Sequence, residues 1–266
     1  MRKKKVLSEV LIILIMIYLV IPFAVTLIYS LSTEWTGILP SGFTLKNYVH
    51  IFSDRKFIES IGRTVIICAV SVLITIIMLL LVMFVVVMNA PWLGKCVQFI
   101  CMIPYALQGV ILSISVISLY AATETFLSNR MLMLFGTYSV LVLPFIYQGI
   151  RSNINAVNGR MLIHAAEILG CSEIKAYVSV VIPNIMPGII VSALLAESVV
   201  FGDFVLANNI AGTNYQNVQV YLYANLFKSS GVSAAIVVVI FAVVFIITGA
   251  VLKLKNLNRK RYGTKI

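Results

Sequence analysis

Six long stretches without a charged residue dominate this sequence. Each is about 20 residues or longer, which is enough for a helix to cross the roughly 30 Å hydrocarbon core of a bilayer. Backbone groups in lipid must find their hydrogen-bond partners within the segment, so these stretches are predicted to be helices. The predicted fold class is an all-α membrane protein with six transmembrane helices, at 10–31, 64–88, 96–123, 131–150, 176–196 and 229–252.

Composition excludes an ordinary soluble domain. Hydrophobic residues make up 61% of the chain and charged residues 11%, whereas soluble domains carry about 25% charged residues. The four cysteines form no CxxC pair, which argues against a disulfide framework or a zinc site. The net charge of +11 lies at the ends of the apolar stretches, as the positive-inside rule expects, and so does not indicate nucleic-acid binding.

The first and fifth stretches need separate interpretation. The first follows MRKKK, but its apolar part exceeds the 7–15 residues of a signal-peptide core, so we interpret it as a retained helix. The fifth contains Pro183 and Pro187 near its start. We expect its bilayer helix to begin close to Pro183 and to reach past Glu197.

The basic residues predict the topology. With the N-terminus inside, fourteen of the 20 lysines and arginines fall on the inner side, so both termini are predicted to be cytoplasmic. The connection between the fourth and fifth helices, residues 151–183, then faces the cytoplasm; we call it the polar connection. Two longer connections face outward, one at 32–63 and one after Asp203. The whole chain, 1–266, is expected to form a single transmembrane domain.

The polar connection predicts a short helix, a sharp turn and a second short helix. Residues 163–169 are helix formers, and Gly170 is placed to stop the helix. Ser172 can cap the next helix, and Pro183 marks the start of the fifth span. The small Ala165 and Ala166 leave room for close approach by another surface, which fits either docking into a partner's groove or a plain interfacial loop.

These residues resemble a known signature. Membrane subunits of bacterial ATP-binding-cassette (ABC) importers carry a cytoplasmic loop of the form E-A-A-x3-G-x9-I-x-L-P. Ala165 and Ala166 are followed at the same spacing by Gly170, and then by Val180, Ile182 and Pro183. His164 stands where the family usually has glutamate; it can act as a hydrogen-bonding group, or lie on the helix surface without a specific role, and we favour the second interpretation.

The resemblance implies a type I ABC importer permease fold over essentially the whole chain. It implies that the loop docks on a separate ATPase subunit, through His164, Ala165, Ala166, Glu167, Gly170 and Pro183. It also implies a second permease subunit, related or identical, two ATP-binding subunits and an extracytoplasmic substrate-binding protein, all at a bacterial inner membrane. ATP and Mg²⁺ would be bound by the partner ATPase, since this chain has no GxxxxGK[ST] motif.

Three polar residues in or beside the apolar stretches are candidates for a translocation path. Carboxylates are costly in hydrocarbon and usually face a pathway or a partner. Glu197 is the stronger of the two acidic candidates, whereas Asp203 also fits a structural role near the outer surface. Gln108 follows Pro104 in the third stretch and fits either packing or channel lining.

The expected function is transport without catalysis. The chain has no HExxH motif, no paired-histidine metal site and no serine–histidine–acid pattern. The stretch GDFVLANNIAGTNYQNVQVYLY resembles the branch of permeases for polyamines, ferric iron, thiamine and aminoalkylphosphonates, and a polyamine is the first expectation. A stand-alone channel or ion-coupled carrier, a membrane enzyme and a scaffold are the alternatives.

Overall fold

The computed structural model describes residues 2–34, 41–88, 90–107, 109–120 and 128–262, with side chains left out at 2–8, 34, 213–214 and 254–262. The chain forms two compact units. Unit 1 contains Met1–Glu59 and Tyr221–Ile246, and unit 2 contains Ser60–Val220 and Ile247–Ile266. Each unit is described by itself.

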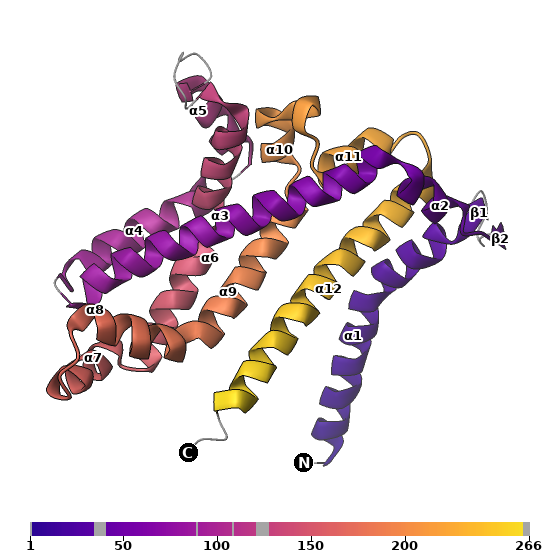
Figure 1. Ribbon diagram of the computed structural model, residues 1–266. Coiled ribbons are helices and arrows are strands. Elements are labelled where there is room, and N and C mark those ends of the chain that lie inside the picture. Colours follow the sequence, from indigo (N-terminus) through magenta and orange to yellow (C-terminus); the bar gives the residue numbers. More distant parts are fainter. Residues whose placement is uncertain (1, 35–40, 89, 108, 121–127, 263–266) are drawn as a thin grey trace. The chain divides into compact units, whose positions relative to one another are not determined.

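Unit 1 is built on two long apolar helices that run side by side (Figure 1). Helix α1 spans Arg2–Ser30, and α12 spans Ser230–Tyr262 and ends beyond the unit. The rings of Phe23 and Phe241 meet edge to face with centroids 5.2 Å apart, which joins the two helices. Between them in sequence lie α2 (Lys46–Ser53) and α11 (Val218–Asn225).

A short β-hairpin corrects the all-α prediction. Strands β1 (Ser32–Glu34) and β2 (Ser41–Phe43) pair antiparallel, with Ser32 opposite Phe43. The hairpin follows the end of α1, where the chain has left its apolar stretch. Outside hydrocarbon the backbone no longer has to satisfy itself within one helix, so a two-stranded ladder is allowed there.

Unit 2 contains the remaining helices (Figure 1). Their bounds are α3 Arg55–Met88, α4 Leu93–Ala106, α5 Val110–Tyr120, α6 Arg130–Ala156, α7 Gly159–Ile168, α8 Glu173–Ala176, η2 Tyr177–Val181, α9 Ile182–Gly202, α10 Val205–Ile210 and η3 Gly212–Tyr215, where η2 is a π-helical turn and η3 a 3₁₀ turn.

Close packing of α6 against α9 forms the centre of unit 2. A Cβ at Gly149 would collide with Ser192, and one at Gly188 would collide with the amide of Asn153. Small residues at such crossings let two helix backbones approach closely, which is the usual way that helices associate in membranes. Fully buried Ile185 and nearly fully buried Val200 extend the same contact stripe along α9.

Helix α3 begins nine residues earlier than its apolar stretch predicts. Its 34 residues extend over about 51 Å, well beyond the hydrocarbon thickness. A carboxylate oxygen of Asp54 accepts the backbone N–H of Lys56 at 2.9 Å, which satisfies a donor in the first turn. Arg55 and Glu59 add an ion pair one turn apart, at 2.8 Å.

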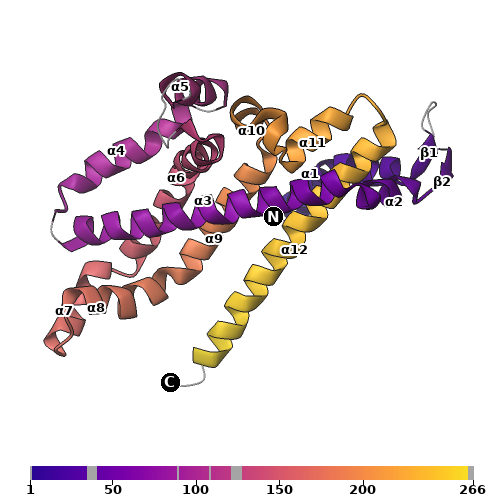
Figure 2. The ribbon, with the colours of Figure 1, turned by 45° about the horizontal axis from the view of Figure 1, so that its top comes forward.

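The predicted third span is broken into two helices. Helix α4 continues through Pro104 to Ala106, and α5 starts at Val110 after Gly109, whose φ is +64°. The two helices meet at 104° (Figure 2). Within the described residues, five helices are therefore long and apolar enough to cross a membrane, or up to six if this bent pair forms one span.

Candidate functional site: the polar connection

A tight turn carries the chain from α6 into α7. Asn158 adopts a left-handed conformation with φ +49°. Gly159 is buried, and a Cβ there would lie 3.0 Å from Ile154 and 3.5 Å from Val181. The start of α7 is therefore pressed against both α6 and the turn η2 that leads into α9.

Gly170 ends α7 as the sequence predicts. Its φ is +85°, a conformation that glycine adopts at little cost. The Gly170 N–H donates to the carbonyl of Glu167 at 2.8 Å, and the Cys171 N–H donates to the carbonyl of Ala166 at 3.0 Å. These two bonds form a Schellman motif, which closes the helix end and fixes the direction of the following chain.

One face of the polar connection is anchored in unit 2. Ile163, Ala176 and Val181 are completely buried. The hydroxyl of Tyr177 donates to the carbonyl of Leu80 on α3 at 2.9 Å, and its ring packs against Phe84 with centroids 5.1 Å apart. This underside holds α7 and α8 at a defined position against α3 and α9.

The opposite face is apolar and open. We define the exposed apolar patch as Met161, Ile168, Leu169 and Ile174, whose exposed fractions are 72%, 87%, 87% and 67%. Ala165 is exposed beside them and Ala166 is half-buried. Large apolar side chains gathered on a polar connection mark a surface that another protein or a membrane covers.

His164 is exposed on the surface of α7 and has a partner within the same helix. Its Nδ1 lies 2.9 Å from Oε2 of Glu167, one turn further along α7. Ser172 occupies the cap position of α8, but its side chain makes no capping hydrogen bond. Pro183 is exposed in the first turn of α9, directly after the π-helical turn η2.

Of the candidates for the translocation path, the structure describes Glu197 and Asp203, which share no hydrogen-bond partner among the described residues. Gln108 lies outside the described residues. Glu197 lies within α9, and its carboxylate has no hydrogen-bond or ion-pair partner among the described residues. The thiol of Cys68 forms a weak hydrogen bond, 3.9 Å long, with the backbone oxygen of Glu197.

Asp203 lies just beyond α9, and one of its carboxylate oxygens accepts several hydrogen bonds. Its Oδ2 accepts the hydroxyl of Tyr138 at 2.9 Å and the backbone N–H of Leu206 at 3.0 Å. A second backbone bond, from Ala207, is 3.4 Å long. The carboxylate therefore joins α6 to the first turn of α10, and a role in the path stays a prediction.

A groove beside the α6–α9 contact was not predicted from the sequence. Its volume is about 530 Å³, and its polar lining consists of Gln148, Ser152, Asn153 and Ser192. Glu197 follows Leu195 by two residues, so helical spacing places it on the other flank of the buried stripe. Gly149 in the fourth apolar stretch and Gly188 in the fifth are small residues at which two helices can approach closely. They were the sequence signal that could have located this groove.

The sequence family described as the binding-protein-dependent transport system inner membrane component matches residues 52–259, most of the chain. The chain belongs to this family. It is thus a multi-pass protein of the bacterial inner membrane and a permease component of an ABC importer.

Two curated relatives are permeases. This chain is 23% identical over 200 residues to the spermidine/putrescine transport system permease protein PotC of Haemophilus influenzae. The match covers 75% of this chain and 76% of PotC. The chain is 22% identical over 257 residues to PhnV of Salmonella paratyphi A, named as a candidate 2-aminoethylphosphonate transport system permease, covering 95% and 94%.

A solved structure shares the fold. A chain of a bacterial ABC transporter involved in the import of the acidic polysaccharide alginate matches 97% of the permease, and 96% of that chain is covered. The TM-score is 0.62 and the sequence identity 17%. This likeness confirms the ABC importer permease fold. The described residues hold five candidate spans, or six if α4 and α5 form one, so the exact count of six stays a prediction.

Proposed function

We propose that the polar connection docks a separate ATPase subunit and passes its movement to the transmembrane helices. The observation that carries this proposal is the exposed apolar patch on an element whose other face is buried. A loosely attached loop could bind a partner without moving anything else. Here Ile163 fixes α7 to unit 2, while Leu169 is free to be covered.

The route for the movement is short. Helix α7 packs on η2, and η2 continues directly into α9, so residues Glu173–Gly202 form one unbroken helical path. A push on the patch is transmitted as a rigid-body displacement of α9 against α6. The residues proposed to take part are His164, Ala165, Ala166, Glu167, Gly170 and Pro183.

The assembly that fits this role has a second permease subunit, related or identical, two ATPase subunits and an extracytoplasmic substrate-binding protein. The partner ATPase would bind ATP and Mg²⁺. Both termini and the polar connection would face the cytoplasm. Large apolar surfaces remain exposed on this single chain. The most apolar part of Glu9–Ser30 has no buried residue, and lipid or the second subunit would cover it.

The proposed substrate is a polyamine such as spermidine or putrescine. Support comes from the similarity to PotC and from Glu197, an intramembrane carboxylate that attracts cations. The similarity to PhnV makes 2-aminoethylphosphonate the alternative, and ferric iron and thiamine follow from the branch resemblance. Both named substrates carry a primary ammonium group, which a carboxylate in the path could bind.

A pull-down of the tagged chain from its native membrane tests the docking role. Ala166→Asp places a charge on the half-buried flank of α7, and Gly170→Asp disturbs the Schellman motif. Lys175→Gln, at an exposed position of α8, is the matched control. We expect an ATPase with Walker motifs to co-purify with the wild type and the control. Retention of that ATPase by both aspartate variants would refute the proposal.

A further inference from the structure

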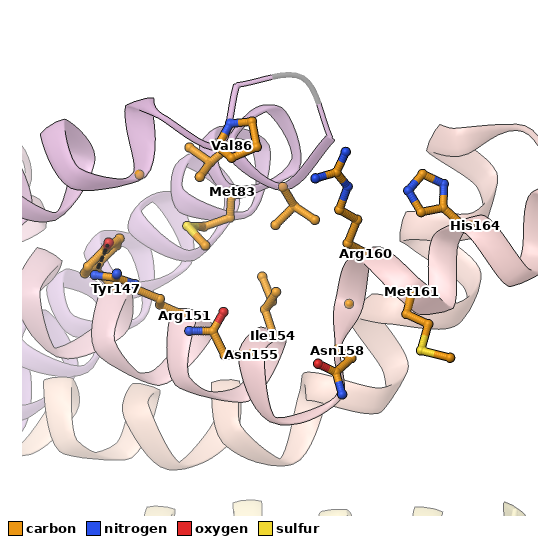
Figure 3. Close-up of a pocket in the computed structure, with 14 residues that line it drawn as sticks. Met83, Val86, Tyr147, Arg151, Ile154, Asn155, Asn158, Arg160, Met161 and His164 are labelled. Carbon is orange, nitrogen blue, oxygen red and sulfur yellow. Dashed lines mark hydrogen bonds between the residues drawn. The ribbon is translucent and has the colours of Figure 1, made fainter.

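A cavity of about 870 Å³ lies beside α7, on the side where α3 ends and turns into α4 (Figure 3). One wall comes from α3 and the α3–α4 turn, and the other from the end of α6 and the start of α7. The cavity therefore lies where the apolar parts of α3 and α6 give way to polar chain.

The lining of this cavity has an apolar part and a basic part. Met83 and Val86 of α3 and Ile154 of α6 form an apolar part. Arg151, Arg160 and His164 supply basic groups, and no carboxylate lines the cavity within the part of the chain that the structure describes. Such a lining matches a ligand with an anionic head and an apolar body.

The two arginines of the lining have no carboxylate partner among the described residues. Arg160 is exposed and forms no ion pair with any described residue. Among the described residues, Arg151 donates a side-chain hydrogen bond to the hydroxyl of Tyr147, at 3.1 Å. Glu167 is engaged by Nδ1 of His164 at 2.9 Å. Figure 3 shows the side chains of Arg160 and His164 extending from α7 on the same side of the cavity. Two guanidinium groups without a carboxylate partner at one cavity attract an anion.

We propose that this cavity binds the phosphate headgroup of an anionic phospholipid, with an acyl chain along the wall of Met83, Val86 and Ile154. Basic pockets between transmembrane helices at the cytoplasmic surface bind anionic headgroups for the same physical reasons. The proposal rests on the cytoplasmic placement of the polar connection given above. A bound headgroup joins the α3–α4 turn to α7 and so stiffens the element that docks the ATPase.

The test uses the full chain, purified in detergent without an ATPase, and native mass spectrometry. Dioleoylphosphatidylglycerol is titrated against dioleoylphosphatidylcholine, and inorganic phosphate is added as a competitor. Arg160→Gln removes one cavity charge at an exposed position, so the chain should still fold. Lys175→Gln removes the same charge on α8, outside the cavity.

We expect phosphatidylglycerol to bind in preference to phosphatidylcholine, and Arg160→Gln to weaken it about fivefold, the loss expected for one cation near an anionic lipid surface. Lys175→Gln should leave the affinity unchanged. Equal affinity in the wild type and Arg160→Gln, or equal binding of both lipids, would overturn the proposal. Binding of inorganic phosphate without any binding of phosphatidylglycerol would assign the cavity to a soluble phosphate instead and reject the lipid.

This experiment fails or succeeds separately from the pull-down. Lipid binding is measured on the free chain, so loss of ATPase docking does not change it. Equally, absence of lipid selectivity leaves the co-purification of an ATPase as it was.

Discussion

Ile163 and Ile168 lie five residues apart on α7 and have opposite environments: the first is fully buried and the second is 87% exposed. The buried isoleucine fixes α7 to the rest of unit 2. The exposed one belongs to the apolar patch that nothing in the described chain covers. An element held on one side and free on the other can both receive a partner and transmit its movement.

Gly170→Ala should loosen the end of α7. No atom lies within 4 Å of an added Cβ, so the cost comes from the left-handed backbone alone, about 1 kcal/mol. Hydrogen exchange at the amide of Cys171, which closes the Schellman motif, should become faster. Gly170→Asn is the control, because asparagine tolerates this conformation and should exchange close to the wild-type rate. Equal exchange in all three proteins would contradict the account.

Gly149→Ala should destabilise the packing of α6 on α9. The new methyl group would overlap Ser192, and such overpacking costs about 1–3 kcal/mol. Gly136 is the matched control on the same helix, since nothing lies within 4 Å of its Cβ position. Thermal unfolding in detergent should therefore show a lower midpoint for Gly149→Ala only. An equal midpoint for the two variants would mean that the helices are not in close contact.

Asp203→Ala should reduce stability at the junction of α6, α9 and α10. The substitution removes the acceptor for Tyr138 and for the first turn of α10, and losing a helix-end acceptor costs about 0.5–2 kcal/mol. Glu197→Gln, on α9, should leave the unfolding midpoint unchanged, because its carboxylate has no partner to lose among the described residues. If Glu197→Gln proved the more destabilising of the two, the roles assigned to these carboxylates would be reversed.

Asp54 and Tyr221 should give unit 1 a pH-dependent stability. The Tyr221 hydroxyl donates to Asp54 at 2.6 Å, and this bond lowers the pKa of Asp54 from its ordinary value of 3.8. A lowered pKa stabilises the folded state above pH 3.8, and this contribution is lost as the pH falls through the lowered value. Thermal unfolding between pH 7 and acid should show this loss in the wild type and less of it in Tyr221→Phe. The same profile in both would contradict it.

Local chemistry explains what the sequence could predict. Gly170 was placed correctly at the end of α7 because a glycine after helix formers is a local signal. The apolar stretches predicted the spans, but not the early start of α3, since Arg55, Glu59 and Arg63 within its first turns have no apolar signature. Pro104 indicated an interruption in the third stretch, but α4 continues through it and the break lies at Gly109.

Tertiary contacts explain what the sequence could not predict. The sequence separated Asp203, with a possible structural role near the outer surface, from Glu197, but it could not predict that Tyr138 of α6 is the partner of Asp203. The basic cavity requires Arg160 of α7 to lie beside the end of α3, from which it is separated by more than 70 residues. No pattern along the chain predicts a contact of this kind.

A photo-cross-linking amino acid at Leu169 tests the central claim most directly. The side chain is 87% exposed within the patch, so the substitution should not disturb the fold. Phe227, 85% exposed after α11 and proposed to lie on the outer side, is the matched control. We expect illumination of native membranes to join the Leu169 position to an ATPase with Walker motifs, and the Phe227 position to no such protein. A normally inserted chain that gives no ATPase adduct at Leu169, or one that gives it at Phe227, would contradict the proposed docking role of the polar connection.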